Sequence, residues 1–259
     1  MNIATLPHAL AGVSEEEWQL RCDLAALYRL VAHHRWTDFV YTHISARLPG
    51  PDHHFLINKY GVLFHEMRAS DLVKIDLHGN VVEEGDTSSR RVNAAGFTIH
   101  SAIHMARPDL ACVVHTHTQA GIAVSCMKDG LLPLSQHALK FYGRIAYHGY
   151  EGIALDLDER DRLVHDLGSE HKAMILRNHG LLVGGTSIAE AFHMIYMLER
   201  ACAAQVAALS CGQEVVLPPK DVCEHTSAQF KSMENDDHYG WMWQSALRMI
   251  EDDRPEYRS

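Results

Sequence analysis

Two histidines that close a run of β-branched residues restrict the fold of this chain more than any other feature. The segment Ala-Cys-Val-Val-His-Thr-His-Thr spans residues 111–118 and contains His115 and His117. Successive side chains of a β-strand point to opposite faces, so two histidines separated by one residue point the same way and can reach one metal ion. The run therefore predicts a strand whose end carries half of a metal site.

A third histidine follows another apolar run. His179 closes Ala-Met-Ile-Leu-Arg-Asn-His (173–179), and Gly180 follows it, where we expect a tight turn. Two strands that each end in histidine could meet at one edge of a sheet and leave open positions on the ion, as catalytic zinc sites do. The sequence thus predicts a metal site formed by His115, His117 and His179. The alternative is a set of half-buried histidines hydrogen-bonded to the backbone.

Length, composition and charge limit the class of protein. With 259 residues, 47% of them hydrophobic, the chain can bury a large core. Its formal net charge of −10 disfavours nucleic acid and anionic membranes as partners and favours a small-molecule substrate. We find neither a basic leader nor an apolar run near the roughly 20 residues that span a bilayer, so we expect a cytoplasmic protein. Six scattered cysteines without a Cys-x-x-Cys motif predict reduced thiols.

The order of the predicted elements indicates an α/β fold with a central sheet and helices on its faces. We expect a single domain over 1–259, with a core over about 14–212 and a C-terminal helical tail over 213–259. Capping boxes at Ser14 and Ser187 and helical spacing predict long helices. Short β-type runs separated by turn signals predict a meander of antiparallel strands over 39–82. The expected helices are 15–34, 93–106, 119–127, 159–167 and 187–210, and the other expected strands are 111–117, 145–147, 173–177 and 181–183.

Several segments taken together resemble the class II aldolase/adducin family. They are Asn-Ala-Ala-Gly-Phe-Thr-Ile-His-Ser-Ala-Ile-His-Met-Ala-Arg-Pro-Asp-Leu-Ala-Cys-Val-Val-His-Thr-His-Thr (93–118), Arg-Asn-His-Gly (177–180), Tyr-Thr-His-Ile-Ser-Ala-Arg (41–47) and Phe-Leu-Ile-Asn-Lys-Tyr-Gly (55–61). The resemblance implies an α/β/α sandwich around a mostly antiparallel sheet and a homotetramer with active sites between subunits. In the family's sugar-phosphate aldolases, three histidines hold a zinc ion that stabilises negative charge on the substrate's oxygens. The matching positions here are His115, His117 and His179.

The chain departs from these aldolases where they carry an acid/base glutamate. That glutamate ends a Ser-Ser-Glu motif nineteen residues before the first metal histidine, and the matching residues here are Ala94, Ala95 and Gly96. A glycine cannot transfer a proton, and alanines cannot hydrogen-bond a phosphate group. Thr42-His43 likewise replaces the Gly-Asn of the aldolase phosphate loop. Asn-x-x-Gly-Phe (93–97) and Tyr-x-His-Ile (41–44) instead resemble the adducin-like branch, whose head domains typically do not use an intact catalytic site.

Other residues become candidates because the resemblance places their segments at the substrate pocket. His43 is the candidate for proton transfer, and the candidates for substrate binding are Asn58, Lys59 and Gly61. The alternative for each is a solvated residue near a strand end. His100 and His104 lie four apart on one helical face, and we expect structural roles for both, with His100 beside the three metal histidines.

Three functions remain open at this point. The first is a divalent-metal-dependent lyase of the class II aldolase type, acting on a small oxo or hydroxy compound that chelates the ion. Zn²⁺ is the expected metal, with Fe²⁺ and Mn²⁺ as alternatives. The second is a non-catalytic adducin-like binding or assembly module. The third is a mononuclear Fe(II) oxygenase on the same fold, because a three-histidine facial site also suits Fe(II) and O₂.

Overall fold

A mixed seven-stranded sheet forms the centre of the protein. The computed structural model describes residues 12–82, 91–153 and 158–259, and within these ranges the strand order is β3-β2-β1-β4-β7-β6-β5. The strands are β1 (His43–Arg47), β2 (Phe55–Ile57), β3 (Val73–Ile75), β4 (Cys112–Thr116), β5 (Ile145–His148), β6 (Ala173–Leu176) and β7 (Gly180–Gly185). Neighbouring strands are antiparallel except β5 and β6, which run parallel. The expected antiparallel meander over 39–82 corresponds to β1, β2 and β3.

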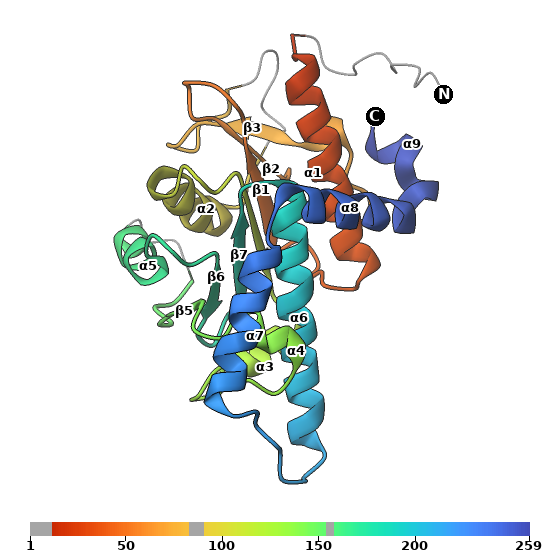
Figure 1. Ribbon diagram of the computed structural model, residues 1–259. Coiled ribbons are helices and arrows are strands. Elements are labelled where there is room, and N and C mark those ends of the chain that lie inside the picture. The colour runs from red at the N-terminus through yellow and green to blue at the C-terminus, as the bar shows by residue number, and fades with distance from the viewer. Residues whose placement is uncertain (1–11, 83–90, 154–157) are drawn as a thin grey trace.

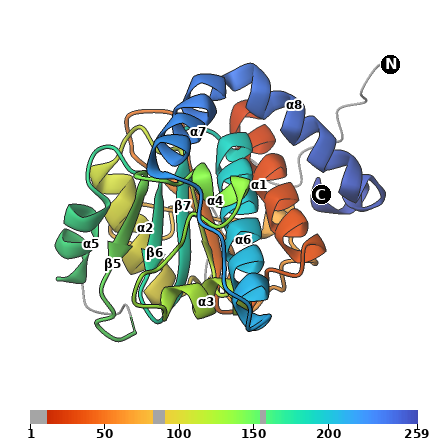
Figure 2. The same cartoon turned by 60° about the horizontal axis from the view of Figure 1, so that its bottom comes forward.

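Helices cover both faces of the sheet. Helices α1 (Glu15–His33) and α6 (Ile188–Ser210) lie on one face, and α2 (Ala94–Ala106) and α5 (Glu159–Leu167) lie on the other (Figure 1; Figure 2). Two buried apolar clusters fill the spaces between these layers. The predicted α/β class, with helices flanking a central sheet, is confirmed.

Strand β4 shows how one sequence run serves both layers. Cys112 and Val114 pack into the apolar cluster of α1 and α6, whereas Val113 packs into the cluster of α2 and α5. Continuing the alternation, His115 belongs to the α2 face and Thr116 to the α6 face. The histidines therefore leave the strand on the side of the sheet that α2 covers.

Side-chain caps fix the two long helices where the sequence predicts. The hydroxyl of Ser14 accepts a hydrogen bond from the backbone N–H of Glu17 at 3.1 Å, and Ser187 accepts from Glu190 at the same distance. Each bond satisfies one of the N–H groups that the first turn of a helix leaves open. The shorter helix α3 (Gln119–Ser125) begins in the same way at Thr118, which accepts from Gly121.

The last part of the described chain is helical and packs against the long helices. It contains α7 (Lys220–Met233), α8 (Asp236–Leu247), the 3₁₀ turn η2 (Arg248–Asp253) and α9 (Arg254–Tyr257). Trp243 and Ile250 enter the apolar cluster shared by α1 and α6. Two short elements were not predicted, namely η1 (Ala69–Asp71) and α4 (Gln136–Leu139). None of the helices in the described ranges is both long and apolar enough to cross a membrane.

Candidate metal centre

The ends of β4 and β7 bring the three predicted metal histidines to one edge of the sheet. His115 lies in β4 opposite Leu182 of β7, and His117 follows the end of β4. His179 comes directly before β7, after a turn in which Asn178 has a left-handed φ of 55°. A Cβ atom at residue 180 would overlap the carbonyl oxygen of Thr116, so only glycine allows this close approach of the two strands.

The three imidazole rings form a compact triangle. Ring centroids are 4.6 Å apart for His115 and His117, 4.8 Å for His115 and His179, and 4.7 Å for His117 and His179. One nitrogen of each ring can be chosen so that the three atoms lie within 4.8 Å of one another. The structure therefore juxtaposes the residues that the sequence selected, although metal binding itself stays a prediction.

Hydrogen bonds at the Nδ1 atoms orient two of the rings. His115 Nδ1 lies 2.9 Å from the carbonyl oxygen of Leu181, and His117 Nδ1 lies 2.9 Å from Oδ2 of Asp38. Both partners accept, so each Nδ1 carries the proton and each Nε2 presents a lone pair. The two Nε2 atoms are only 2.8 Å apart. Two lone pairs at this separation repel each other, and a cation bound between them removes the repulsion.

The electrostatic surroundings favour the neutral form of two of the imidazoles, His115 and His179. Burial, followed by the neighbouring histidines, holds the pKa of His115 well below its usual value. Burial also lowers the pKa of His179 to about 4. A metal ligand must be a deprotonated imidazole nitrogen, so these rings need not lose a proton at neutral pH before they bind an ion.

A buried carboxylate on the other face of the sheet anchors the same strand end. Glu199 of α6 accepts hydrogen bonds from Oγ1 of Thr116 at 2.5 Å and from Oγ1 of Thr118 at 2.6 Å. Burial raises the pKa of Glu199 to about 7, even though both hydroxyl groups lower it. Because the threonines alternate with the metal histidines, Glu199 restrains the backbone that carries the rings. Sequence inspection did not select Glu199 or Asp38, and alternation of His and Thr over 115–118 was the only local signal for a partner on the second face.

His43 occupies the space beside Gly96, where the family's aldolases carry glutamate. In the sheet His43 pairs with His115, and the ring centroids are 5.0 Å apart. A Cβ atom at residue 96 would lie 2.5 to 2.9 Å from ring atoms of His43, with Nε2 at the longest of these distances. A larger residue at position 96 would therefore displace the imidazole. The missing glutamate side chain at residue 96 and the His43 ring beside it are therefore linked, because the ring fits only when residue 96 is small.

A hydrogen-bonded series of side chains continues from His43 beneath α2. Nδ1 of His43 lies 2.8 Å from Nε2 of His100, Nδ1 of His100 lies 2.5 Å from Oγ of Ser45, and the same Oγ lies 2.7 Å from Nε2 of His104. All four residues are buried. His43 therefore separates His100 and His104 from the metal triangle, so His100 does not lie directly beside the three metal histidines as expected. The structural roles of His100 and His104 stay a prediction.

The predicted substrate-binding residues occupy different surroundings. Asn58 is buried, and its Oδ1 accepts a hydrogen bond from the hydroxyl group of Tyr28 at 2.9 Å. That contact makes it part of the scaffold. Lys59 is half-buried at the end of β2, and extending the β1–β2 register places it opposite His43 at the same sheet edge. Gly61 is exposed and has a φ of 95°. Of the three, Lys59 is the residue that the topology brings nearest to the metal triangle along this edge.

Comparison with known proteins agrees with this geometry. A family model described as "Class II Aldolase and Adducin N-terminal domain" matches residues 22–206. The chain is similar to the crystal structure of an aldolase II superfamily protein from Pseudomonas syringae, with 53% identity, a TM-score of 0.90 and coverage of 96% of this chain and 98% of that one. For an L-fuculose 1-phosphate aldolase from Glaciozyma antarctica PI12 the identity is 30%, the TM-score 0.83 and the coverage 98% and 97%.

Similarity also extends to a much longer protein. Alpha-adducin from Rattus norvegicus is 50% identical over 191 residues. The match covers 74% of this chain but only 26% of that protein. The shared segment is therefore a fold that occurs both as a chain of this size and as one part of a larger polypeptide.

Proposed function

Because the chain belongs to the class II aldolase and adducin family, we propose that it is a metal-dependent lyase acting on a small oxo or hydroxy compound. The observation that carries the proposal is the triangle of His115, His117 and His179, in which hydrogen bonds leave the Nε2 atoms of His115 and His117 free to bind a cation. Three protein ligands leave positions for a chelating substrate, which separates catalytic from structural metal sites.

The donor set fits a borderline divalent cation. Imidazole nitrogen suits Zn²⁺ and Fe²⁺, whereas Mn²⁺ prefers oxygen ligands and is the less favoured alternative, and Zn²⁺ is our first choice on the family pattern. When bound, such an ion supplies Lewis-acid stabilisation of negative charge on substrate oxygens. Asp38 and the carbonyl group of Leu181 would hold His117 and His115 in the tautomer and orientation that binding requires.

We assign proton transfer to His43. Its Nδ1 atom is committed to His100, which leaves Nε2, the atom beside Gly96, for the reacting group. Burial together with the charge of neighbouring histidines keeps the pKa of His43 below its usual value, so the ring is neutral at pH 7. A neutral imidazole can accept a proton or donate a hydrogen bond at this position. Lys59, at the same edge, is the proposed substrate contact.

Metal analysis tests the first part of the proposal. Protein purified without chelator should contain about one divalent ion per chain, and the variant His115→Ala/His117→Ala/His179→Ala should contain none. His165→Ala is the matched control, because the side chain of His165 is 87% exposed and lies outside the site. Equal metal content in the triple variant and the control would contradict the proposal.

Turnover tests the second part. With an aldol substrate identified by screening small hydroxy-carbonyl compounds, His43→Ala should lower kcat by about 10² to 10⁴ while metal content is unchanged, as expected for a lost acid/base group. Unchanged kcat would remove His43 from the reaction. Oxygen consumption with Fe(II) in the same screen would instead identify an oxygenase.

A non-catalytic binding or assembly module is the second candidate, favoured by the similarity to alpha-adducin and by Gly96. In that case the triple histidine variant should assemble like the wild type, and the screen should show no metal-dependent turnover. We also propose a homotetramer on the family pattern. Native mass spectrometry of both proteins measures the assembly directly, and a monomer would exclude the tetramer.

A further inference from the structure

A cavity lies at the end of the sheet opposite the metal centre. Its volume is about 390 Å³. Strand β6 begins directly after Lys172, which lines the cavity, and ends three residues before His179. The length of this strand therefore separates the cavity from the metal triangle. The charged side chains that line the cavity are Lys140, Arg144, Glu170, Lys172, Lys231 and Glu234.

Strand register places two cations side by side in this cavity. Ile145 of β5 pairs with Ala173 of β6 in parallel register, so the preceding residues, Arg144 and Lys172, are neighbours at the strand ends. Lys140, the residue that follows α4, reaches the same space. Like charges on adjacent strands destabilise a sheet unless negative charge lies close to them. Any carboxylate or bound anion at this edge is therefore stabilised.

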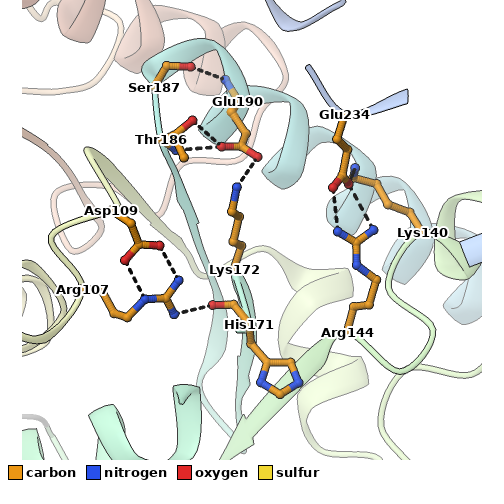
Figure 3. Close-up of polar contacts among 10 residues, drawn as sticks. All are labelled: Arg107, Asp109, Lys140, Arg144, His171, Lys172, Thr186, Ser187, Glu190 and Glu234. Atoms are coloured by element: carbon orange, nitrogen blue, oxygen red, sulfur yellow. Dashed lines mark hydrogen bonds and ion pairs between the residues drawn. The ribbon is translucent and has the colours of Figure 1, made fainter. Parts of the chain in front are cut away.

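Two carboxylates of the chain already form ion pairs with these cationic side chains. Glu234 accepts from Lys140 Nζ at 2.6 Å and from Arg144 Nη2 at 2.6 Å (Figure 3). Burial alone would raise the pKa of Glu234, but the hydrogen bonds from these cations outweigh it and lower the pKa to about 2. Glu190 accepts from Lys172 at 2.8 Å and is nearly fully buried. The site thus holds carboxylate groups in their ionised form.

Positive charge remains after these pairs are counted. Four cationic side chains line the cavity (Lys140, Arg144, Lys172 and Lys231), and three carboxylates oppose them, namely Glu170 and Glu234 in the lining and Glu190, which pairs with Lys172, so one positive charge is in excess. The chain as a whole has a net charge of −10, so this concentration is local. Lys231 is exposed and has no ion pair with any described residue, and the side chain of Lys172 is 29% exposed. Both ammonium groups therefore have donors available to a guest molecule.

We propose that the cavity bounded by Lys140, Arg144, Lys172 and Lys231 binds a small organic anion, either a phosphate monoester or a dicarboxylate. Guanidinium and ammonium groups are the side chains that bind phosphate and carboxylate. The volume lies within the range of roughly 300 to 1,000 Å³ for ligand pockets. Because the residues differ from those of the metal centre, this site and the proposed lyase function can fail independently.

Isothermal titration calorimetry tests the proposal with two probes, glycerol 3-phosphate and succinate, and with glycerol as the uncharged control. The titrations use the intact chain at low ionic strength, first as wild type with a chelator and then as His115→Ala/His117→Ala/His179→Ala, so that binding at the metal centre does not contribute. We expect one probe molecule per chain in both proteins and none for glycerol. Binding of glycerol 3-phosphate alone identifies a phosphate site, and binding of succinate alone identifies a dicarboxylate site.

Two variants locate the binding. Lys231→Gln and Arg144→Gln should each weaken it by about tenfold, since each removes one charged hydrogen-bond donor. Lys220→Gln, an exposed change on the same helix as Lys231, should leave it unchanged. Lys231 is exposed, so its variant keeps the fold even if Arg144→Gln proves unstable. Absence of heat up to about 10 mM of either probe, or binding that neither variant weakens, would overturn the proposal.

Discussion

The two ends of the central sheet carry opposite kinds of site on the same scaffold. At one end, four histidines lie close together (His43, His115, His117 and His179). Burial favours the neutral form of His43, His115 and His179, and hydrogen bonds hold the Nδ1 atoms of His43, His115 and His117. At the other end, Arg144 and Lys172 are cationic side chains that donate hydrogen bonds to carboxylates. The histidines and the two cationic residues all lie at or next to strand ends. The strand does not continue past them, so no further strand residues cover their side chains.

The difference shows how the charge of the side chains at each site determines which kind of ion the site attracts. Buried imidazoles with low pKa values present lone pairs, which attract a cation. Lysine and arginine donate hydrogen bonds and have no acceptor, so an anion complements both their hydrogen atoms and their charge. The same strand-end geometry therefore suits the proposed cation at one end and the proposed anion at the other. Four substitutions test this contrast, taken in order of decreasing effect.

Asp38→Ala should have the largest effect, and it acts at the histidine end alone. Removing the acceptor at His117 Nδ1 frees the ring and its tautomer, so Zn²⁺ affinity should fall by about 10- to 100-fold. Competition with a chromogenic chelator measures the affinity. Asp52→Ala, at an exposed position, is the control. Unchanged affinity would show that Asp38 does not orient the ligand.

Glu199→Gln should stabilise the protein at high pH. The pKa of Glu199 is raised from an ordinary 4.5 to about 7, so the folded state binds the extra proton and the wild type loses stability as pH rises from 4.5 to 7. In the presence of a chelator, the variant should be more stable than wild type by about 2 kcal/mol at pH 8 and equal to it near pH 4. Urea unfolding at both pH values measures this difference.

The control for this change is Glu224→Gln on α7, whose side chain is 58% exposed. Its effect on stability should stay within about 0.5 kcal/mol at both pH values. A stability difference for Glu199→Gln that does not change with pH would contradict the raised pKa.

Gly96→Ala tests whether His43 fills the place of a side chain at residue 96. The new Cβ atom would overlap the imidazole, and we expect a loss of about 1 to 2 kcal/mol in the free energy of unfolding. The same change in a His43→Ala background should cost much less, because the overlapping ring is gone. Gly240→Ala, in a helix with open space around it, should not destabilise the protein. Equal losses in both backgrounds would show that the ring does not occupy this space.

Arg144→Gln should have the smallest effect, at the cationic end. Glu234 keeps Lys140 as a partner, so the loss at pH 7 should be about 1 kcal/mol. The pKa of Glu234 is lowered to about 2, so its ion pairs contribute above pH 4.5 and are lost as pH falls toward 2. The difference from wild type should shrink over that range in urea unfolding, whereas Arg248→Gln should show no such trend.

Local patterns were sufficient for the elements that line both sites. The capping boxes predicted helix starts at Ser14 and Ser187, and in the structure the hydroxyl group of each serine accepts the expected N-cap hydrogen bond. The strand ending at His115 and His117 was predicted from alternation, which is a property of neighbouring residues. Helix α4 was missed because its four residues are too few to show a period. The parallel pairing of β5 and β6 was missed because register depends on contacts between distant segments.

The partners of the site residues lie beyond the reach of local patterns. Asp38 is 79 residues from His117, and Glu199 is 83 residues from Thr116. The sequence showed that Gly96 replaces a glutamate of the family's aldolases. Only the pairing of His43 with His115 showed what stands in that space.

The amino-acid sequence by itself determined which side chains can bind a metal and which elements present them, because the alternation of a strand and the period of a helix are set by adjacent residues. Tertiary structure decided which nitrogen of each imidazole is free, which carboxylates are buried, and where Arg144 and Lys172 become neighbours. Those properties depend on burial and on contacts between residues far apart in the chain, and they exist only once the sheet has assembled.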